Sequence, residues 1–262
     1  MILKRTLVFL TLTILFVSQV SGQTNLCAKV DKELTQLYSK IFPFYYGDLD
    51  SLIHYSDLFS TKLTTYVKSD PSTIECSFKS FTDSIGSIVT TSDGLFRIYS
   101  WDTWTGGTMH NYKNLFQYNS EGKVFVKVFD YGEGDMGTYF TMVYSLKDPN
   151  NKTYILALSG GTESSAVGYE SISFYSISGD TLNDKVPLLK TSNGYEESLS
   201  IEYDFSSVND RSQLIKYDSD LKIIYIPIAS DKGKITDNYS IYKFTGQYFE
   251  KIGTRKLIQI EK

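Results

Sequence analysis

Hydrophobic and polar positions follow two different periods along the chain, and the change between them falls near residue 85. From residue 23 to about residue 81, apolar residues recur every three to five positions, which is the spacing of amphipathic helices. Asp48 and Asp50 precede the second of these runs and are suited to cap it, and Pro71 marks its stop or a restart. We therefore expect residues 23–84 to form a helical N-terminal region of two short helices packed on the main domain. The apolar residues with this spacing are Leu34, Leu37, Ile41, Leu52, Ile53, Leu58 and Leu63.

From residue 85 onward the pattern approaches a period of two, and runs of strand-forming residues alternate with turn signals. The strand-like runs are 95–101, 124–129, 154–158, 172–177 and 222–228. The turn signals are Asp93-Gly94, Ser120-Glu121-Gly122, Asp148-Pro149-Asn150-Asn151, Ser178-Gly179-Asp180, Asn193-Gly194, Asp218-Ser219-Asp220 and Thr245-Gly246-Gln247. The sequence thus predicts a mainly β domain over 85–262, an antiparallel meander of hairpins arranged as a sandwich or an open barrel.

Several of these hairpins share an imperfect sequence pattern, in which an aromatic residue and a polar turn are followed by Lys or Tyr and then by an apolar strand. An internal repeat of this kind is also compatible with a small β-propeller. A four-stranded blade takes about 40 residues or more, which leaves room for only about four blades in residues 85–262. The propeller is therefore kept as the alternative to the sandwich.

The first 22 residues have the layout of a secretory signal peptide. Lys4 and Arg5 form a positive start, residues 7–17 form a short apolar core, and Val20-Ser21-Gly22 places small residues before Gln23. A membrane-spanning helix needs about 20 apolar residues, which is longer than this run. We expect cleavage before Gln23 and a product that is periplasmic or secreted and has no transmembrane segment.

Cys27 and Cys76 are the only cysteines of the chain. In an exported protein such a pair usually forms a disulfide bond. A bond that closes a loop of about 50 residues stabilises the fold by roughly 4 kcal/mol on the chain-entropy model. A metal or redox pair is disfavoured because the two residues do not form a C-x-x-C motif.

Composition and missing motifs exclude several classes of function. The 262 residues include 41% hydrophobic side chains, enough for a core, and the formal charge of −4 gives nucleic acid no basic surface to bind. The chain lacks G-x-S-x-G, H-E-x-x-H, P-loop and G-x-G-x-x-G motifs, which argues against serine esterases, metalloproteases and nucleotide enzymes. A hydrolase that uses two carboxylates stays open, because it needs only two suitably spaced Asp or Glu residues.

The segment 101–110 contains both tryptophans of the chain, Trp101 and Trp104, beside a Gly-Gly pair. Aromatic rings flanked by polar groups suit a sugar, since rings stack on its apolar face and polar groups bind its hydroxyls. The residues predicted to contribute are Trp101, Asp102, Trp104, Thr105, Thr108 and His110. The competing interpretation is a strand that ends in a glycine turn, with Trp101 in the core, Trp104 on its rim and a structural His110.

Two later loops add candidate residues. Asp130, Glu133 and Asp135 alternate with glycines and would suit Ca²⁺, although a solvated hairpin loop explains the same pattern. Glu163 lies in a Gly- and Ser-rich segment, residues 159–168, which is either a ligand-facing loop or a long connection. If all three loops follow successive hairpins, they meet at one end of the sheet, where binding residues usually lie.

The stretch from Thr90 to His110 reads T-T-S-D-G-L-F-R-I-Y-S-W-D-T-W-T-G-G-T-M-H and is close to the pattern S-x-D-G-x-x-R-x-Y-S-W-D-T-x-T-G-G-T-M-H, with Thr91 in place of its first serine. It resembles a segment of secreted hypothetical proteins of Bacteroidota-type bacteria, in which the segment also follows a short helical region. The resemblance extends over about residues 70–249 and implies a Gram-negative periplasm or secreted fraction. It implies no catalytic residues, because no activity is assigned to that group.

The leading hypothesis is an exported, non-catalytic β-rich protein that binds a carbohydrate or cell-envelope ligand through the loop from Trp101 to His110. The first alternative is a hydrolase that uses Asp102 with Glu133 or Asp135. The second is a structural or assembly protein in which the tryptophan segment is only core.

Overall fold

The computed structural model describes residues 26–44, 47–129, 131, 135–208 and 213–256. The chain divides into two compact units, an N-terminal unit that ends at Ile85 and a β unit that begins at Gly86. The predicted signal peptide, 1–22, lies outside the described residues. No helix within the described ranges is both long and apolar enough to span a bilayer.

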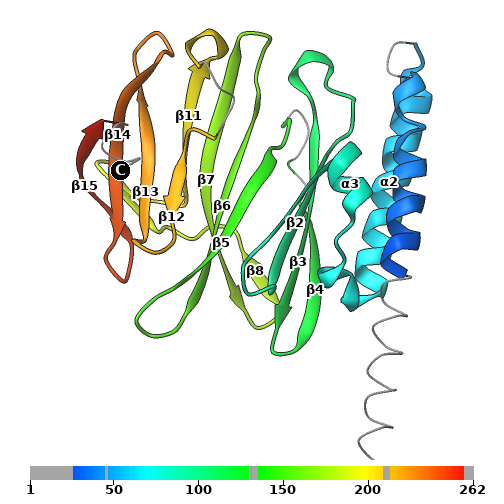
Figure 1. The fold of residues 1–262 in the computed structure, drawn as a ribbon, viewed down its shortest axis with the longest axis horizontal. Coiled ribbons are helices and arrows are strands. Elements are labelled where there is room, and N and C mark those ends of the chain that lie inside the picture. Colours follow the sequence, from blue (N-terminus) through cyan, green and yellow to red (C-terminus); the bar gives the residue numbers. More distant parts are fainter. Residues whose placement is uncertain (1–25, 45–46, 130, 132–134, 209–212, 257–262) are drawn as a thin grey trace, which may run out of the picture. The chain divides into compact units, whose positions relative to one another are not determined.

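The N-terminal unit is helical (Figure 1). A helix over 26–38 is followed by η1 (Phe42–Phe44), α2 (Leu49–Ser69), η2 (Pro71–Glu75) and α3 (Lys79–Ser84). The predicted cap of α2 is confirmed, because an Asp48 carboxylate oxygen accepts the Ser51 backbone N–H at 3.1 Å. Ile53 and Leu58 share the apolar spacing but are each 42% exposed. The buried side of α2 consists of Leu52, Ser56, Phe59, Leu63 and Val67.

Two long-range links hold this unit together. The predicted disulfide bond between Cys27 and Cys76 is confirmed, with the two Cα atoms 5.4 Å apart. The buried Asp31 carboxylate accepts the backbone N–H groups of Ser80 and Phe81 at 2.8 and 2.9 Å. These N–H groups lie in the first turn of α3 and have no partner within that helix, so Asp31 of the first helix caps the third.

In the described part of the β unit, the strands form three sheets. The first sheet has the order β1 (Gly86–Thr90), β2 (Phe96–Asp102), β3 (Tyr112–Ser120) and β4 (Lys123–Phe129). The second has the order β11 (Ser198–Asp204), β7 (Val167–Ser178), β6 (Thr153–Thr162) and β5 (Tyr139–Lys147), and β8 (Thr181–Asn183) pairs with β7. The third has the order β10 (Gly194–Glu196), β9 (Leu189–Thr191), β15 (Phe249–Lys256), β14 (Ile235–Phe244), β13 (Ile223–Ala229) and β12 (Lys216–Asp218). The predicted turn signals fall between these strands.

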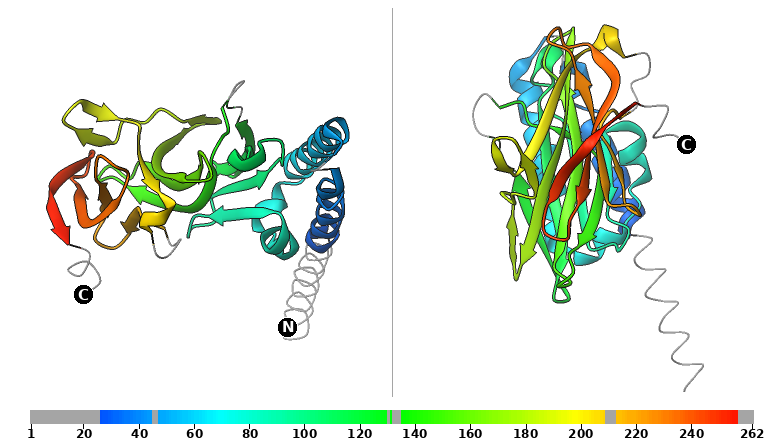
Figure 2. Two further views of the ribbon diagram at one scale, coloured as in Figure 1. Left: turned by 90° about the horizontal axis from the view of Figure 1, so that it is seen from above. Right: turned by 90° about the vertical axis from the view of Figure 1, so that its left-hand side faces the viewer.

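The second sheet is the middle layer, and Figures 1 and 2 show the three sheets following one another in chain order. On one side, Ile155 and Tyr175 pack with Phe116 of the first sheet. On the other side, Leu156 and Phe174 join a core cluster with residues of the third sheet. Side chains of a strand alternate between its two faces, so a strand covered on both faces needs a continuous apolar run. This accounts for the buried sequence from Tyr154 to Leu158 on β6.

The mainly β, antiparallel architecture predicted from the sequence is confirmed, and its described strands form stacked layers without a closed barrel. Two pairings depart from a meander, because β11 pairs with β7 and β9 pairs with β15, and neither pair is consecutive in the sequence. β9 leaves the vicinity of the second sheet and pairs in parallel with β15, placing Leu189 beside Phe249. The short loop that would join neighbouring antiparallel strands is not available to a parallel pair, so this contact links distant parts of the chain.

Candidate functional site

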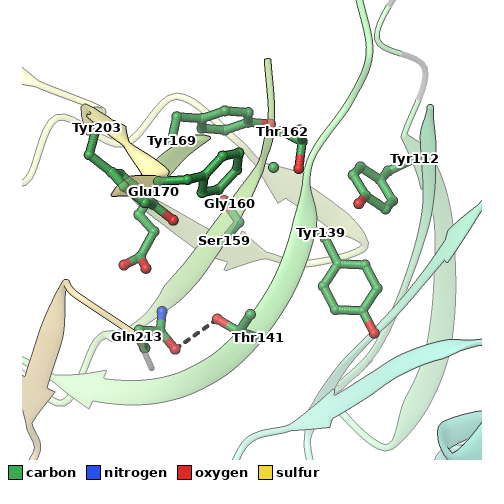
Figure 3. A pocket seen from close by; sticks show the side chains of 12 residues that line it. Tyr112, Tyr139, Thr141, Ser159, Gly160, Thr162, Tyr169, Glu170, Tyr203 and Gln213 are labelled. Carbon is green, nitrogen blue, oxygen red and sulfur yellow. Dashed lines mark hydrogen bonds between the residues drawn. The ribbon is translucent and has the colours of Figure 1, made fainter. Parts of the chain in front are cut away.

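A cavity of about 310 Å³ lies at one end of the second sheet, where β5 and β7 begin and where β6 and β11 end. Its described lining combines aromatic rings with hydroxyl, amide and glycine positions and one carboxylate. Figure 3 shows Tyr169 and Tyr203 across the cavity from Tyr112 and Tyr139. The lining residues are Tyr112, Tyr139, Thr141, Ser159, Gly160, Gly161, Thr162, Tyr169, Glu170, Tyr203, Phe205 and Gln213.

Glycines make room for the rings of this cavity. A Cβ atom on Gly161 would lie 2.7 Å from the Tyr169 ring, and one on Gly168 would lie 2.7 Å from the Phe205 ring. Both distances are too short for any larger residue unless the ring moves. The Gly- and Ser-rich segment 159–168 is therefore partly a strand end that seats aromatic side chains.

The three segments singled out in the sequence meet around this cavity. The Tyr112 N–H donates to the Met136 carbonyl at 2.8 Å, which joins the segment after Trp101 to the loop before β5. The Tyr169 hydroxyl donates to the Gly137 carbonyl at 2.8 Å. The Thr138 hydroxyl lies 3.2 Å from the Gly160 carbonyl and donates to it. In a meander every second connection lies at the same end, so the connections β2–β3, β4–β5 and β6–β7 share this end.

The two tryptophans have different environments. Trp101 is 1% exposed and lies in β2, between β1 and β3, so the prediction that it stacks on a ligand is corrected by its burial. Trp104 is partly exposed and adopts a φ of 61°, in the left-handed region. A stacking role for a tryptophan of this loop thus falls to Trp104.

Asp102 and His110 form a close pair at the two ends of the loop. The buried Asp102 carboxylate lies 2.5 Å from His110 Nδ1, and its other oxygen accepts the Trp104 N–H at 2.8 Å. His110 also has a positive φ of 53°. A residue with a positive φ in a tightly bonded loop often occurs at functional sites, where the surrounding contacts hold the strain.

The other predicted residues of the loop contribute to its internal structure. Thr105 Oγ1 lies 2.8 Å from the Thr103 hydroxyl and accepts Asn111 Nδ2–H at 2.9 Å. Thr108 lies in η3 (Gly107–Met109), the short helical turn at the tip. A Cβ on Gly106 would lie 2.5 Å from the His110 carbonyl carbon, so only glycine allows this closed shape.

An aromatic series connects this loop to the cavity. The ring centroids of Trp104 and His110 are 6.1 Å apart, and the His110 ring stacks on Tyr112 at 5.9 Å. Tyr112 in turn contacts Tyr139 edge to face at 5.4 Å. Because Tyr112 and Tyr139 line the cavity, the predicted loop forms its flank.

The predicted acidic residues have separate positions. Asp130 and Glu133 lie outside the described residues, and one Asp135 oxygen accepts the Gly137 N–H at 2.9 Å. Glu163 directly follows Thr162 of the cavity lining, and burial and the charge of Glu202 raise its pKa. Among the described residues, no group of three His, Cys, Asp or Glu side chains is placed to hold a metal ion, so the Ca²⁺ site stays a prediction.

Glu170 is a cavity residue that sequence reasoning missed. It is 9% exposed, and its carboxylate accepts the Leu214 N–H at 2.9 Å and the Ile215 N–H at 2.8 Å. Burial raises its pKa and outweighs these two backbone donors. Glu170 thereby fixes the segment that carries Gln213 against β7, and Gln213 forms part of the cavity wall.

The tyrosines of the cavity were also missed. The pKa values of Tyr112, Tyr139 and Tyr169 are raised, mainly because these side chains are buried. Their hydroxyls therefore stay neutral at physiological pH and can both donate and accept hydrogen bonds. The only hint of these cavity residues in the sequence was a glycine next to a tyrosine, as in Gly168-Tyr169. No family model and no curated protein matches this chain.

Proposed function

We propose that the β unit binds a saccharide in the aromatic cavity and does not alter it chemically. The observation that carries this proposal is a cavity whose aromatic rings are interspersed with neutral polar groups such as Thr141, Ser159 and Gln213. Sugar rings have an apolar face that stacks on aromatic side chains and an edge of hydroxyls that needs hydrogen-bond partners. The volume of about 310 Å³ is at the lower end of the range for small-molecule sites, which suits one end of a glycan.

The loop from Asp102 to His110 supports the same proposal. Its hydrogen bonds hold Trp104 and His110 beside Tyr112, so the aromatic surface continues from the cavity to its flank. A surface that is already ordered binds without a large entropic cost. The Cys27–Cys76 disulfide supports a location outside the cytosol, in the periplasm or the secreted fraction, where the ligand would be a glycan or another cell-envelope component.

Isothermal titration calorimetry tests the proposal. The purified protein is titrated with oligosaccharides of glucose, galactose, N-acetylglucosamine and glucosamine, and with muropeptides. We expect saturable binding of at least one of them, and about a tenfold loss of affinity in Tyr169→Leu, which removes a lining ring. Phe205→Leu gives the same test should the first variant fail to fold.

Tyr195→Leu is the matched control, because Tyr195 is 55% exposed on β10 and does not line the cavity. Equal losses in Tyr169→Leu and Tyr195→Leu would place the ligand elsewhere. Absence of binding across the whole panel would overturn the proposal.

A hydrolase is the second candidate, and the Asp102–His110 pair is the observation that favours it. A histidine held through Nδ1 by a buried carboxylate is oriented to act as a general base. This candidate expects release of reducing sugar from a bound glycan, and His110→Gln should then abolish turnover while binding persists. A binding protein releases no product in either form.

A further inference from the structure

We propose that the ligand of the aromatic cavity carries a protonated amine, as in an amino sugar whose amine is free. This inference rests on the proposed saccharide binding and adds the charge of the ligand to it. The described lining contains five aromatic rings, those of Tyr112, Tyr139, Tyr169, Tyr203 and Phe205. The face of each ring is electronegative, so rings that surround a cavity attract a cation through cation–π interactions.

Carboxylates lie around the same cavity on more than one side. Glu170 is part of the lining, and Glu163 directly follows Thr162, which is also part of it. Tyr169 lies within the electrostatic influence of Asp135 and Glu163, and Tyr112 lies within that of Asp102. These carboxylates favour a cation over an anion in the cavity, and this preference adds to the attraction of the rings for a cation.

The described lining residues include no Lys, Arg or His side chain. A protonated amine thus meets no competing cation from the wall, whereas a phosphate, sulfate or uronic acid would find no cationic partner there and would face carboxylates. A second cavity of the β unit has a mixed composition, with Lys190 and Lys251 beside Glu196 and Glu250 in its lining. The absence of basic groups is a property of the aromatic cavity and not of the whole unit.

Two matched pairs of probes test the charge of the ligand. The first pair is an oligomer of glucosamine and the N-acetylglucosamine oligomer of the same length, which differ in the free amine. The second pair is choline and its neutral isostere 3,3-dimethylbutan-1-ol, which report on the cavity without a sugar. Each is titrated calorimetrically into the purified protein at a pH slightly below neutral. We expect the cationic member of each pair to bind about tenfold tighter than its neutral partner, with a preference that falls as salt is added.

The outcomes separate this inference from the proposed function. Equal or reversed affinities within a pair would overturn the amine while leaving saccharide binding in place. Absence of binding by every saccharide would overturn both, and choline binding alone would support the cation site and overturn the sugar.

A variant pair sharpens the test. Glu163→Gln removes a charge beside the cavity and should reduce the ratio of the two affinities, because the amine loses a favourable field. Glu196→Gln removes the same charge at the second cavity and should leave that ratio unchanged. An unchanged ratio in Glu163→Gln together with an unchanged ratio in Tyr112→Leu would contradict the cation site.

Discussion

Two cavities of the β unit differ in what their walls offer to a ligand. The aromatic cavity measures about 310 Å³ and presents rings and neutral polar groups, with Glu170 bonded to backbone N–H groups. The second cavity is larger, about 600 Å³, and its lining is rich in charge. There Lys190 already lies 2.6 Å from Glu250 and above the Tyr248 ring at 5.2 Å. The two cavities show that volume alone does not identify a binding site, because charges that are already paired, such as Lys190 and Glu250, gain little from a ligand.

The largest expected effect comes from filling the space that a glycine leaves in the aromatic cavity. Gly161→Ala places a methyl group 2.7 Å from the Tyr169 ring, so the ring must move. We expect saccharide affinity to fall by about tenfold or more and the free energy of unfolding to fall by about 1–3 kcal/mol. Calorimetric titration and thermal unfolding measure the two effects.

Gly47→Ala is the control for this substitution, since no atom lies within 4 Å of the added methyl group. If Gly161→Ala keeps both the affinity and the melting temperature of the unchanged protein, the ring does not depend on this glycine and the cavity is more adaptable than described.

A smaller effect is expected where β5 meets the segment before β12. Thr141 Oγ1–H donates to Gln213 Oε1 at 2.9 Å, a bond that Figure 3 shows across the cavity wall. Thr141→Val removes this bond. We expect the free energy of unfolding to fall by about 1 kcal/mol, which corresponds to a fall in melting temperature of about 2–4 °C. Differential scanning calorimetry detects a change of this size, and a variant as stable as the parent would show that the bond contributes nothing.

The pH dependence of stability distinguishes Glu170 from the paired charges of the second cavity. Burial raises the folded-state pKa of Glu170 above its ordinary value of 4.5, so the folded protein takes up this proton at a higher pH than the unfolded chain. Its contribution to stability therefore grows as the pH falls through the raised pKa towards 4.5 and is lost as the pH rises. Glu170→Gln should abolish this part of the pH profile when melting temperature is measured from pH 4 to 8 for both proteins. Identical slopes would contradict the assignment.

The smallest effect belongs to the second cavity. Lys190→Met breaks the exposed pair with Glu250, and exposed pairs contribute little because water and salt screen them. We expect neither the melting temperature nor the affinity for any saccharide to change measurably. A loss of binding in Lys190→Met would reverse the comparison and move the ligand to the second cavity.

The secondary structure could be predicted because its signals are local. Asp48 caps α2 within one turn, and the turn signals fall between strands of the β unit. The stacking order of the three sheets could not be predicted. The apolar run from Tyr154 to Leu158 indicates that β6 is buried on both faces, but it does not indicate which sheets cover those faces. Trp101 was assigned to a ligand for a related reason, because burial of β2 depends on strands that come later in the chain.

The site could be predicted only in part. The loop from Asp102 to His110 stood out because unusual residues lie close together in the sequence, and the structure places it beside the cavity. The cavity itself is assembled from β3, β5, β6, β7, β11 and the segment at Gln213. Its tyrosines are separated along the chain and have no shared motif, so only the register of the strands brings them together.

The parallel contact between β9 and β15 makes the folding of the β unit depend on segments that lie far apart in the sequence. In the first sheet, each strand pairs with the strand that follows it in the sequence. Leu189 and Lys190 instead pair with Phe249 and Glu250, with β10 to β14 between them in the sequence, and contacts between such distant segments are expected to form slowly. Leu189 and Phe249 are both fully buried in the finished protein, so a chain that breaks off before Phe249 presents apolar surface to proteases and chaperones. Deletion of β15 should therefore expose Leu189 and make the β unit more sensitive to proteolysis.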